Sequence, residues 1–307
     1  MSLIVSTAPH VRSSLTTRKI MLNVVVALLP CAAAGIYYFG YRAAIVLAVS
    51  MLSAVLSEFI WQKATRQRVK ISDCSALVTG LLVGLTVTPT APWWLVMIGS
   101  IFAIIVVKQL FGGIGDNFLN PALAARAVLL ASWPARMTAH IAVTAFPGVD
   151  IAASATPLVG AEASIMQLLM GNVPGAIGET CKIAIILGFV YLLLTETITF
   201  EIPVITVASA FVLSYLLGMD PVTTILSGGL LFGAVFMATD YATSPMHRWA
   251  RVLYAIGIGC LTVLIRKFGA YPEGVTYAIL FMNILTPLLD RMLPNRVYGH
   301  SRKKEAK

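Results

Sequence analysis

Charged residues are scarce in this chain of 307 residues. Asp, Glu, Lys and Arg make up 11% of it, whereas an ordinary soluble domain carries about 25%. Hydrophobic residues make up 58%, and the mean hydropathy is +0.87. A soluble fold of this size could not cover its surface with so few charges, so the soluble enzyme classes are excluded. The composition predicts an all-α integral membrane protein that crosses the bilayer several times.

Cysteines with the spacing of metal ligands are also missing. The four cysteines, Cys31, Cys74, Cys181 and Cys260, lie far apart, and no CxxC pair occurs. A disulfide framework, a zinc site and an iron–sulfur ligand set are therefore excluded, and we interpret the cysteines as small apolar residues in helices. The sequence also has no GxGxxG after a strand, which excludes a dinucleotide-binding fold.

Negative charge is the scarcer sign, because 22 Lys and Arg face 13 Asp and Glu, for a net charge of +9. In a membrane protein such an excess marks the cytoplasmic side. Since there is no soluble domain to bind it, nucleic acid is not expected as a partner. The first apolar run begins at Ile20 and is followed by another span, so we expect no cleavable signal peptide.

Ten apolar segments could cross the bilayer, for which about 20 residues are needed. They cover residues 20–39, 43–62, 75–89, 93–111, 118–133, 181–198, 201–218, 222–238, 249–266 and 273–292. The third and the eighth are short and rich in glycine, which is typical of half-helices or of tightly packed spans.

The distribution of positive charge predicts the orientation. If all ten segments cross and the N-terminus is cytoplasmic, sixteen Lys and Arg lie on the cytoplasmic side and five on the outer side. Both termini are then cytoplasmic, and the long outer loop is expected to pack on the membrane surface. The predicted parts are a cytoplasmic N-terminal segment (1–19), a first membrane repeat (20–133), a periplasmic loop (134–180), a second membrane repeat (181–293) and a basic cytoplasmic tail (294–307).

The two halves resemble each other, which predicts an internal duplication. The matching pairs are residues 80–84 (GLLVG) with 229–233 (GLLFG), 17–20 with 180–183, and 118–120 with 281–283. Each copy would contain five spans, an odd number, so the second copy must be inverted in the membrane. In such proteins short interrupted segments at matching positions mark the ligand site; here these are the third and eighth segments, with plain helix packing as the alternative.

A tight loop of small residues, GNVPGAIGET at 171–180, precedes the sixth span. Glu179 and Thr180 lead into that helix, whose N-terminus offers free N–H groups and the positive end of its dipole, suited to a phosphate. The alternative is an ordinary helix start with Thr180 near the cap.

Two further segments carry polar side chains. Residues 236–245 (FMATDYATSP) end the eighth segment with hydroxyl and acidic groups that could coordinate a cation, hydrogen-bond a ligand or only form caps and turns. Residues 112–122 (GGIGDNFLNPA) place Asn117 and Asn120 one helical turn apart. Paired amides can bind a planar heterocycle that both donates and accepts hydrogen bonds. Alternatively, Asn120 only caps the fifth span before Pro121.

Together these three segments resemble the RnfD/NqrB family, which contains one membrane component of the Rnf electron-transport complex and one of the sodium-translocating NADH:quinone reductase. The resemblance covers about residues 8–295, and the motifs at 175–180 and 237–245 are fairly specific to the family. The N-terminal extension of the quinone reductase component is absent, which favours the Rnf side. The resemblance implies a urea-transporter-like fold with about ten transmembrane segments in two inverted five-segment repeats.

The resemblance further implies that FMN is joined to Thr180 through a phosphoester bond, which a dedicated flavin transferase makes. Gly175, Gly178 and Glu179 belong to the same motif, and we expect the acceptor hydroxyl on an exposed loop with small neighbours. Positions 176 and 181 are alanine and cysteine, where serine is frequent in the family, but both leave the acceptor hydroxyl intact.

A second, noncovalent flavin, riboflavin or FMN, is implied near the cytoplasmic face. The predicted duplication maps Thr180 onto Thr17, beside the two asparagines. The cofactor-binding residues expected on this side are Thr17, Asn117, Asn120, Asp240 and Thr243. Two flavins at related sites would form an electron path across the membrane, with relay centres in partner subunits.

The function implied by the resemblance is that of one component in a complex of the bacterial inner membrane. The complex would couple electron transfer between ferredoxin and NAD to the movement of Na⁺ or H⁺. Its partners would be the A, B, C, E and G components of the Rnf complex, the flavin transferase and membrane lipids. A urea-transporter-like solute channel and a structural scaffold are the alternatives. Covalent flavin on Thr180 would distinguish the Rnf function from both of them, because neither needs a flavin.

Ionisable residues within predicted spans are functional candidates by default. They are Glu58, Lys108, Asp116, Arg126 and Asp240. Glu58 and Arg126 could also simply pair with each other or reach toward the membrane surface.

Overall fold

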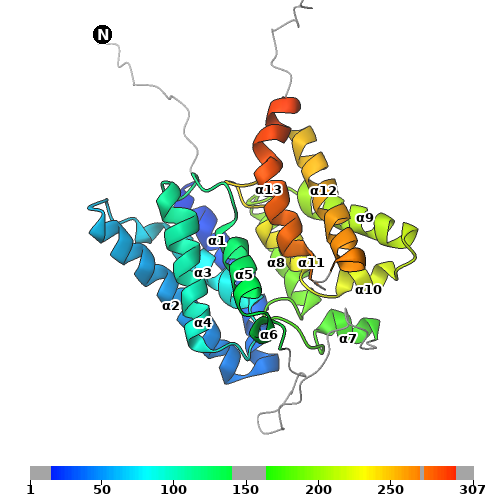
Figure 1. Cartoon of the computed structure of the whole chain (residues 1–307), viewed down its shortest axis with the longest axis horizontal. Coiled ribbons are helices and arrows are strands. Elements are labelled where there is room, and N and C mark those ends of the chain that lie inside the picture. The colour runs from blue at the N-terminus through cyan, green and yellow to red at the C-terminus, as the bar shows by residue number, and fades with distance from the viewer. Residues whose placement is uncertain (1–14, 140–163, 270–272, 295–307) are drawn as a thin grey trace, which may run out of the picture.

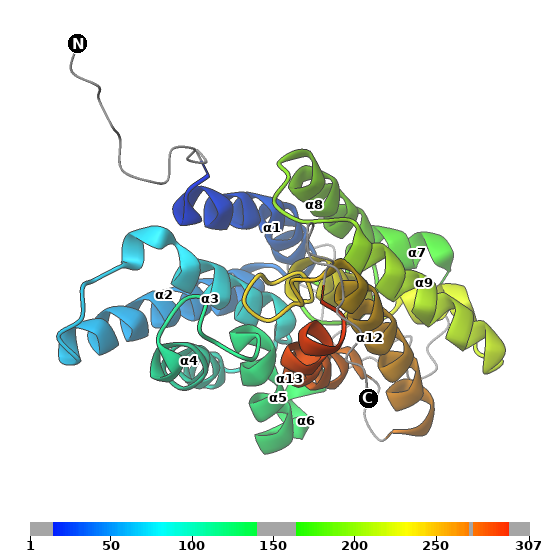
Figure 2. The same ribbon diagram turned by 90° about the horizontal axis from the view of Figure 1, so that it is seen from above.

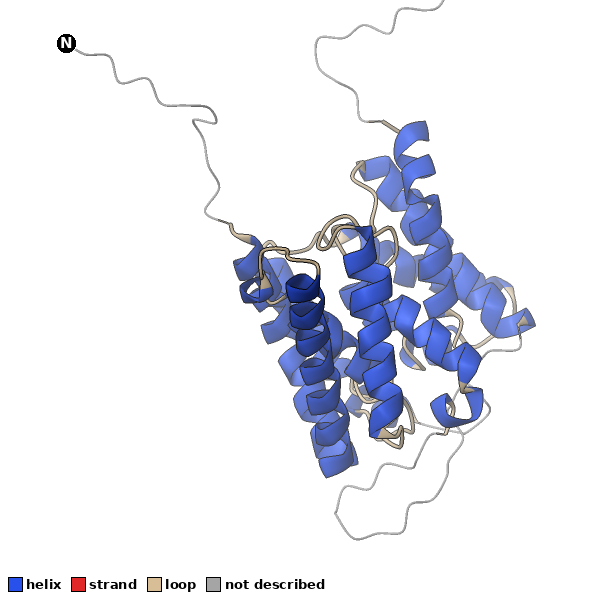
Figure 3. Cartoon of the chain, turned by 60° about the vertical axis from the view of Figure 1, so that its left-hand side comes forward, coloured by secondary structure: helices blue, strands red, loops and turns tan. Residues whose placement is uncertain are grey.

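The computed structural model describes residues 15–139, 164–269 and 273–294, and every regular element in these ranges is a helix (Figure 3). The elements are α1 (Thr17–Phe39), α2 (Tyr41–Ala64), η1 (Ile71–Asp73), α3 (Ser75–Thr86), α4 (Trp93–Phe102), η2 (Ala103–Lys108), η3 (Gln109–Phe111), α5 (Pro121–Ser132), α6 (Pro134–Met137), α7 (Ile165–Met170), α8 (Lys182–Leu194), α9 (Glu201–Leu216), α10 (Pro221–Leu226), α11 (Leu230–Phe232), η5 (Gly233–Met237), α12 (Arg248–Phe268) and α13 (Val275–Met292).

Four helices are long and apolar enough to cross a membrane: Thr17–Phe39, Tyr41–Ala64, Trp93–Phe111 and Arg248–Phe268. Four shorter helices, α3, α5, α8 and α9, are also apolar. Large apolar side chains are exposed on the outer faces of these helices, as Leu52, Leu56 and Ile60 on the long helix α2 illustrate. The all-helical membrane class is confirmed, while the number of ten spans stays a prediction.

Small and hydroxyl residues let the helices of the first half approach closely. A Cβ on Gly80 of α3 would lie 2.8 Å from the Ser50 carbonyl oxygen of α2, so only glycine fits without a shift. The Ser50 hydroxyl donates to the Gly80 carbonyl oxygen at 2.5 Å and lies 3.0 Å from the Ser100 hydroxyl of α4. Hydrogen bonds between helices and small interface residues are the usual means of helix association in a bilayer.

The eighth predicted segment is broken in the structure. Helix α10 ends at Leu226, and a new helical stretch, α11 and η5, begins only at Leu230. Gly228, in the break, has a φ of +62°, a conformation that favours glycine. Irregular backbone at membrane depth must be buried in protein, and Ser227 at the break is 1% exposed.

The two halves of the chain pack against each other through related helices. The first helices of the halves, α1 and α8, are in contact, and so are the last ones, α5 and α13. Figures 1 and 2 show the first half, in blue to green, on one side of this boundary and the second half, in green to red, on the other. Within each half the second helix packs on the third and fourth, as α2 does on α3 and α4, and α9 on α10 and α12.

The short sequence matches that predict the duplication take unequal positions in these helices. Residues 80–84 lie inside α3, whereas residues 229–233 span the start of α11. Asn120 precedes α5 as its cap, whereas Asn283 lies in the middle of α13. The related helix contacts are therefore a better indication of two repeats than the matched letters.

Replacing Gly80 by alanine should destabilise the protein by about 1–3 kcal/mol, the usual cost of overpacking. The new Cβ would press on backbone atoms of Ser50 and Met51, which cannot move alone. Gly84→Ala is the matched control, because its Cβ would first meet the flexible Leu47 side chain at 3.0 Å, and the gain in helix propensity is the same in both variants. Thermal unfolding in detergent checks this; equal midpoints would contradict the close contact.

Candidate functional site

Two pockets lie at opposite ends of helix α8. The Thr180 pocket is lined by Leu168, Val173, Pro174, Gly175, Glu179, Thr180, Lys182, Leu226, Ser227, Gly228 and Glu273. The larger Asp240 pocket has the α8 residue Leu192 in its wall. Because an α-helix rises 1.5 Å per residue, the α8 residues Lys182 and Leu192 are separated by roughly 15 Å along the helix axis.

The loop that carries Thr180 is held against the end of α3. The Ile177 amide donates to the Val87 carbonyl oxygen at 3.2 Å, and the Gly178 amide donates to the Leu85 carbonyl oxygen at 2.8 Å. A Cβ on Gly178 would lie 2.7 Å from Leu85 Cβ, so this contact requires glycine. The loop is therefore folded into the protein rather than lying free on the surface.

Thr180 is consequently buried, with 2% of its surface exposed. The expectation of an exposed acceptor loop is wrong, because the pairing with α3 draws the loop inward. The Thr180 hydroxyl oxygen has no hydrogen-bond partner among the residues that the structure describes. A buried hydroxyl without a partner is costly, so this atom fits attachment to a further group. Gly175 leaves room beside it, since a Cβ there would lie 3.2 Å from Thr180 Cγ2.

Arg126 of α5 links the Thr180 loop to α13. Its Nη1 donates to Glu179 Oε1 and its Nη2 to Glu273 Oε2, and the arginine and Glu179 are almost fully buried. Gly229 makes this possible, because any Cβ there would lie 2.5 Å from Glu179 Oε1. Glu58 and Arg126 do not pair with each other, which was one of the two alternatives: Glu58 pairs with Lys108, and Arg126 pairs with Glu179 and Glu273.

Two more cations, Lys182 and Arg266, occupy the break between α10 and α11. Lys182 Nζ donates to the Glu179 carbonyl oxygen and, at 2.9 Å, to the Gly228 carbonyl oxygen. Arg266 Nη1 donates to the Thr224 carbonyl oxygen, and its Nη2 donates to the Ser227 carbonyl oxygen at 3.2 Å. The carbonyl groups left free by the broken helix are thus satisfied by side chains of the protein.

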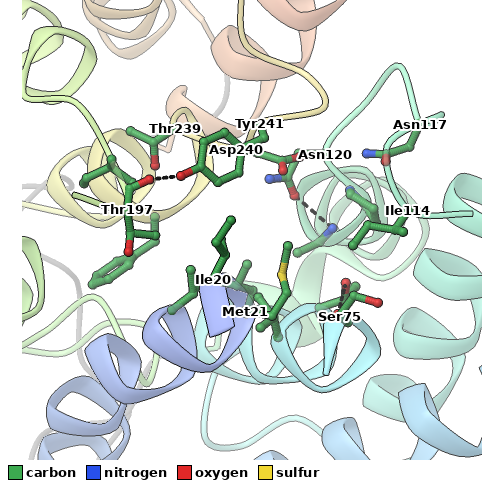
Figure 4. Close-up of a pocket in the computed structure, with 18 of the residues that line it drawn as sticks. Ile20, Met21, Ser75, Ile114, Asn117, Asn120, Thr197, Thr239, Asp240 and Tyr241 are labelled. Carbon is green, nitrogen blue, oxygen red and sulfur yellow. Dashed lines mark hydrogen bonds between the residues drawn. The ribbon is translucent and has the colours of Figure 1, made fainter. Parts of the chain in front are cut away.

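The Asp240 pocket, at the other end of α8, has a cavity volume of about 90 Å³. Its wall consists of Ile20, Met21, Val24, Ser75, Val78, Thr79, Leu82, Lys108, Ile114, Asn117, Asn120, Pro121, Ala122, Leu192, Thr197, Ile198, Phe236, Thr239, Asp240 and Tyr241. A mostly apolar wall with a few polar groups is typical of a site for a small organic ligand. Figure 4 shows Asn117, Asn120, Asp240 and Tyr241 on one side of the cavity, opposite Ile20 and Met21 of α1.

Three of the five residues predicted for the second flavin line this pocket: Asn117, Asn120 and Asp240. Thr243 lies behind them, and its hydroxyl donates to Asp240 Oδ2 at 3.2 Å. Thr17 is exposed and is not part of the wall, which α1 reaches with residues one turn further along. Sequence analysis missed Ser75, Thr197 and Tyr241, because no local motif marks them.

The two asparagines do not act as an equivalent pair. Asn120 Oδ1 accepts hydrogen bonds from the Ala122 and Leu123 amides at 3.0 and 3.2 Å, so Asn120 caps α5, as the alternative interpretation expects. Its Nδ2 donates to the Met237 carbonyl oxygen at 3.2 Å, which joins the two halves of the chain. Asn117 precedes the helix in a loop, and its Nδ2 donates to the Leu119 carbonyl oxygen at 2.9 Å.

A buried ion pair borders the Asp240 pocket. Lys108 Nζ lies 2.9 Å from Glu58 Oε2 and donates to the Ser75 hydroxyl at 2.6 Å. Gln109 and Gln62 donate to Glu58 Oε1 at 2.7 and 3.1 Å, so the carboxylate is well satisfied. Lys108 is the last residue of the π-helical stretch η2, and its ammonium group lies beside the Glu58 carboxylate.

The ionisable residues predicted within spans thus have different surroundings. Glu58, Lys108 and Arg126 are buried and paired. Asp116 is exposed in the loop before α5. Asp240 lies in the wall of the large pocket.

Comparison with known proteins identifies relatives over the whole chain. The model of the NQR2, RnfD, RnfE family matches residues 4–299. The chain is 44% identical to the D component of the Na(+)-translocating ferredoxin:NAD(+) oxidoreductase complex of Acetobacterium woodii, over 100% of this chain and 99% of the relative. It is 38% identical to the D component of the proton-translocating ferredoxin:NAD(+) oxidoreductase complex of Clostridium ljungdahlii, over 97% and 96%. It is 34% identical to the D component of the ion-translocating oxidoreductase complex of Escherichia coli K12, over 96% and 98%.

Replacing Arg126 by methionine should destabilise the protein by about 3–5 kcal/mol, because it removes the cation from the buried carboxylate of Glu179 and from the partly buried one of Glu273. Adding Glu179→Gln and Glu273→Gln to this variant should restore part of the loss, since the two groups that lost the guanidinium are then neutral. Arg18→Met, at an exposed position of α1, is the control. Yield and thermal midpoint of the purified protein check this; a triple variant no better than Arg126→Met would contradict the charge argument.

Proposed function

We propose, since the chain belongs to the NQR2, RnfD, RnfE family, that it is the flavin-carrying membrane subunit of an Rnf-type complex. The complex would transfer electrons between ferredoxin and NAD and couple this to ion movement, as the names of the relatives from Acetobacterium and Clostridium state for those proteins. The coupling ion differs between these two names, Na⁺ in one and a proton in the other. The chain itself would be one subunit of the oxidoreductase and not the whole enzyme.

The observation that carries the proposal is the unpartnered Thr180 hydroxyl in a small, charged pocket within the described part of the chain. FMN would be joined to this oxygen through a phosphoester bond. The donor set fits a phosphate, because the buried ammonium of Lys182 and the hydroxyl of Ser227 line the same pocket. When bound, the flavin would supply one- and two-electron transfer, and the protein would hold and orient it.

Burial of Thr180 has a consequence for the attachment of FMN. A flavin transferase cannot reach a residue that is 2% exposed. The loop would have to separate from the Val87 and Leu85 carbonyl groups, or receive FMN before it folds against them. Opening would break these two backbone hydrogen bonds, at about 0.5–1.5 kcal/mol each, and would also disturb the buried ion pair of Glu179 with Arg126.

The Asp240 pocket is the proposed site of the second, noncovalent flavin. The wall offers Asn117, Asp240 and Thr239 as polar groups among apolar side chains, which is typical of a site for a planar organic ligand. Asn120 would contribute by holding the wall together rather than through a free amide edge. With the first flavin at Thr180, the two sites would lie at the two ends of α8 and form a path for electrons, completed by centres in partner subunits.

The proposed setting is the bacterial inner membrane, with both termini in the cytoplasm. In Figure 1 α1 begins and α13 ends at the same end of the helix bundle, as an even number of crossings requires. The excess of Lys and Arg predicted for one side would make that end cytoplasmic. The Asp240 pocket would then face the cytoplasm and the Thr180 pocket the periplasm. The related contacts of α1 with α8 and of α5 with α13 support two inverted repeats of five spans.

A solute channel of urea-transporter type is less favoured by the same geometry. A pore through the broken eighth segment would have to pass Lys182 and Arg266, whose charged groups are bonded to the carbonyl oxygens at the break. Both pockets are also better explained by bound cofactors than by a continuous channel.

Thr180→Val should abolish covalent flavin, whereas Thr180→Ser should retain it, because serine keeps the hydroxyl. Valine replaces an unpartnered hydroxyl by a methyl group of the same shape, so the fold should be preserved. Ultraviolet fluorescence of the band after denaturing electrophoresis and mass spectrometry of the peptide check this. An FMN adduct that persists in Thr180→Val, or lies on another residue, would refute the assignment.

Val24→Trp should fill the Asp240 pocket and lower its noncovalent flavin content at least about tenfold, because a ring of this size overpacks the site. Val26→Trp is the matched control: it is two residues away on the same helix, is 42% exposed and does not line the pocket. Acid-extractable flavin per mole of purified complex is the measurement. Equal extractable flavin in both variants would count against the pocket, and the adduct on Thr180 should be unchanged in both.

A further inference from the structure

The break between α10 and α11 is lined by cationic side chains. Free carbonyl oxygens at a broken helix can coordinate a cation. Here the carbonyl oxygens of Thr224, Ser227 and Gly228 already accept hydrogen bonds from Arg266 and Lys182. The break therefore presents positive side chains, and what remains free at it is donor capacity.

Two side chains at the break line the Thr180 pocket and can each donate one more hydrogen bond. An ammonium group has three N–H donors, and those of Lys182 make two hydrogen bonds, to the Glu179 and Gly228 carbonyl oxygens. The Ser227 hydroxyl is buried and has no partner within the described ranges. Lys182 and Ser227 are each 1% exposed, and both line the pocket together with Thr180.

The charge around this pocket is also unbalanced by one unit. Three cations, the buried Lys182 and Arg126 and the partly buried Arg266, stand near the two carboxylates of Glu179 and Glu273. One positive charge is left over among the described residues, and a buried charge needs a counter-ion. A phosphate that is esterified twice carries one negative charge, which would neutralise the site.

We propose that Lys182 and Ser227 form the phosphate-binding subsite of the Thr180 pocket and hold the nonbridging oxygens of the phosphodiester that joins flavin to Thr180. The assignment rests on the proposed attachment of FMN to Thr180. Lys182 and Ser227 are positioning residues: they do not exchange electrons with the flavin, but they fix its attachment point and keep the loop closed over the ester.

Loss of either donor should therefore expose the ester more often. A hydrogen bond to a charged group is worth about tenfold or more in an equilibrium constant, so Ser227→Ala and Lys182→Met should each open the loop about tenfold more often. An added phosphodiesterase that cleaves only the open form would then release flavin about tenfold faster, because cleavage follows the population of the open form.

The experiment uses the purified, flavin-loaded complex in detergent. Flavin release by phosphodiesterase is followed as loss of the fluorescent band, and the phosphorus NMR resonance of the intact protein is compared with that after denaturation. Ser227→Thr should behave as wild type because it keeps the hydroxyl. Thr206→Val is the matched control, since the Thr206 hydroxyl is also buried and without a partner among the described residues but does not line the pocket.

The expected result is faster release in Ser227→Ala and Lys182→Met, with the phosphorus resonance moved toward its denatured position, and no change in Ser227→Thr or Thr206→Val. Wild-type release and an unchanged resonance in Ser227→Ala would overturn the subsite, even if Lys182→Met fails to fold. If the wild-type protein carries no FMN on Thr180 by peptide mass spectrometry, the proposed attachment fails instead, and the subsite with it. The two failures are thus separate observations.

Discussion

The buried guanidinium of Arg126 is the interaction on which the Thr180 end of the molecule depends. It holds Glu179 of the Thr180 loop and Glu273 at the start of α13, and it comes from α5, so three separate parts of the chain meet at one cation. A charge in a medium of low dielectric must be paired, and each partner is fixed in place by this requirement. The position of Thr180, the next residue after Glu179, follows from it.

The same requirement recurs wherever the protein buries charge. Lys108 is enclosed by Glu58 and Ser75, and Lys182 and Arg266 by carbonyl oxygens of the broken eighth segment. A charge is tolerated at each of these places because acceptor groups of the protein surround it. The π-helical stretch η2 ends at Lys108, and the α10 break is filled by Lys182 and Arg266.

The proposed function uses the polar groups and the cavity that these arrangements leave without a partner in the described parts of the chain. At one end of α8 the hydroxyls of Thr180 and Ser227 remain without partners in the described parts of the chain, beside an excess positive charge. At the other end a mostly apolar cavity remains between the two halves, with Asp240 and Asn117 in its wall. A rigid, satisfied framework around two unsatisfied sites is what a carrier of two cofactors needs, since the framework keeps their separation constant.

The sequence by itself determines the membrane class, the approximate helix positions and the importance of the Thr180 loop. These depend on local signals: runs of apolar residues, glycine and proline, and a motif of ten residues. It cannot determine which charges pair, because the partners are distant in the chain: Glu58 and Lys108 are 50 residues apart, and Arg126 and Glu273 are 147 apart. Sequence alone therefore offered a Glu58–Arg126 pair as one alternative, which the structure does not contain, and wrongly expected an exposed Thr180. Only the tertiary structure decided both, because the α3 carbonyl groups and Arg126 draw the loop inward and the packing of α2 against η2 gives Glu58 to Lys108.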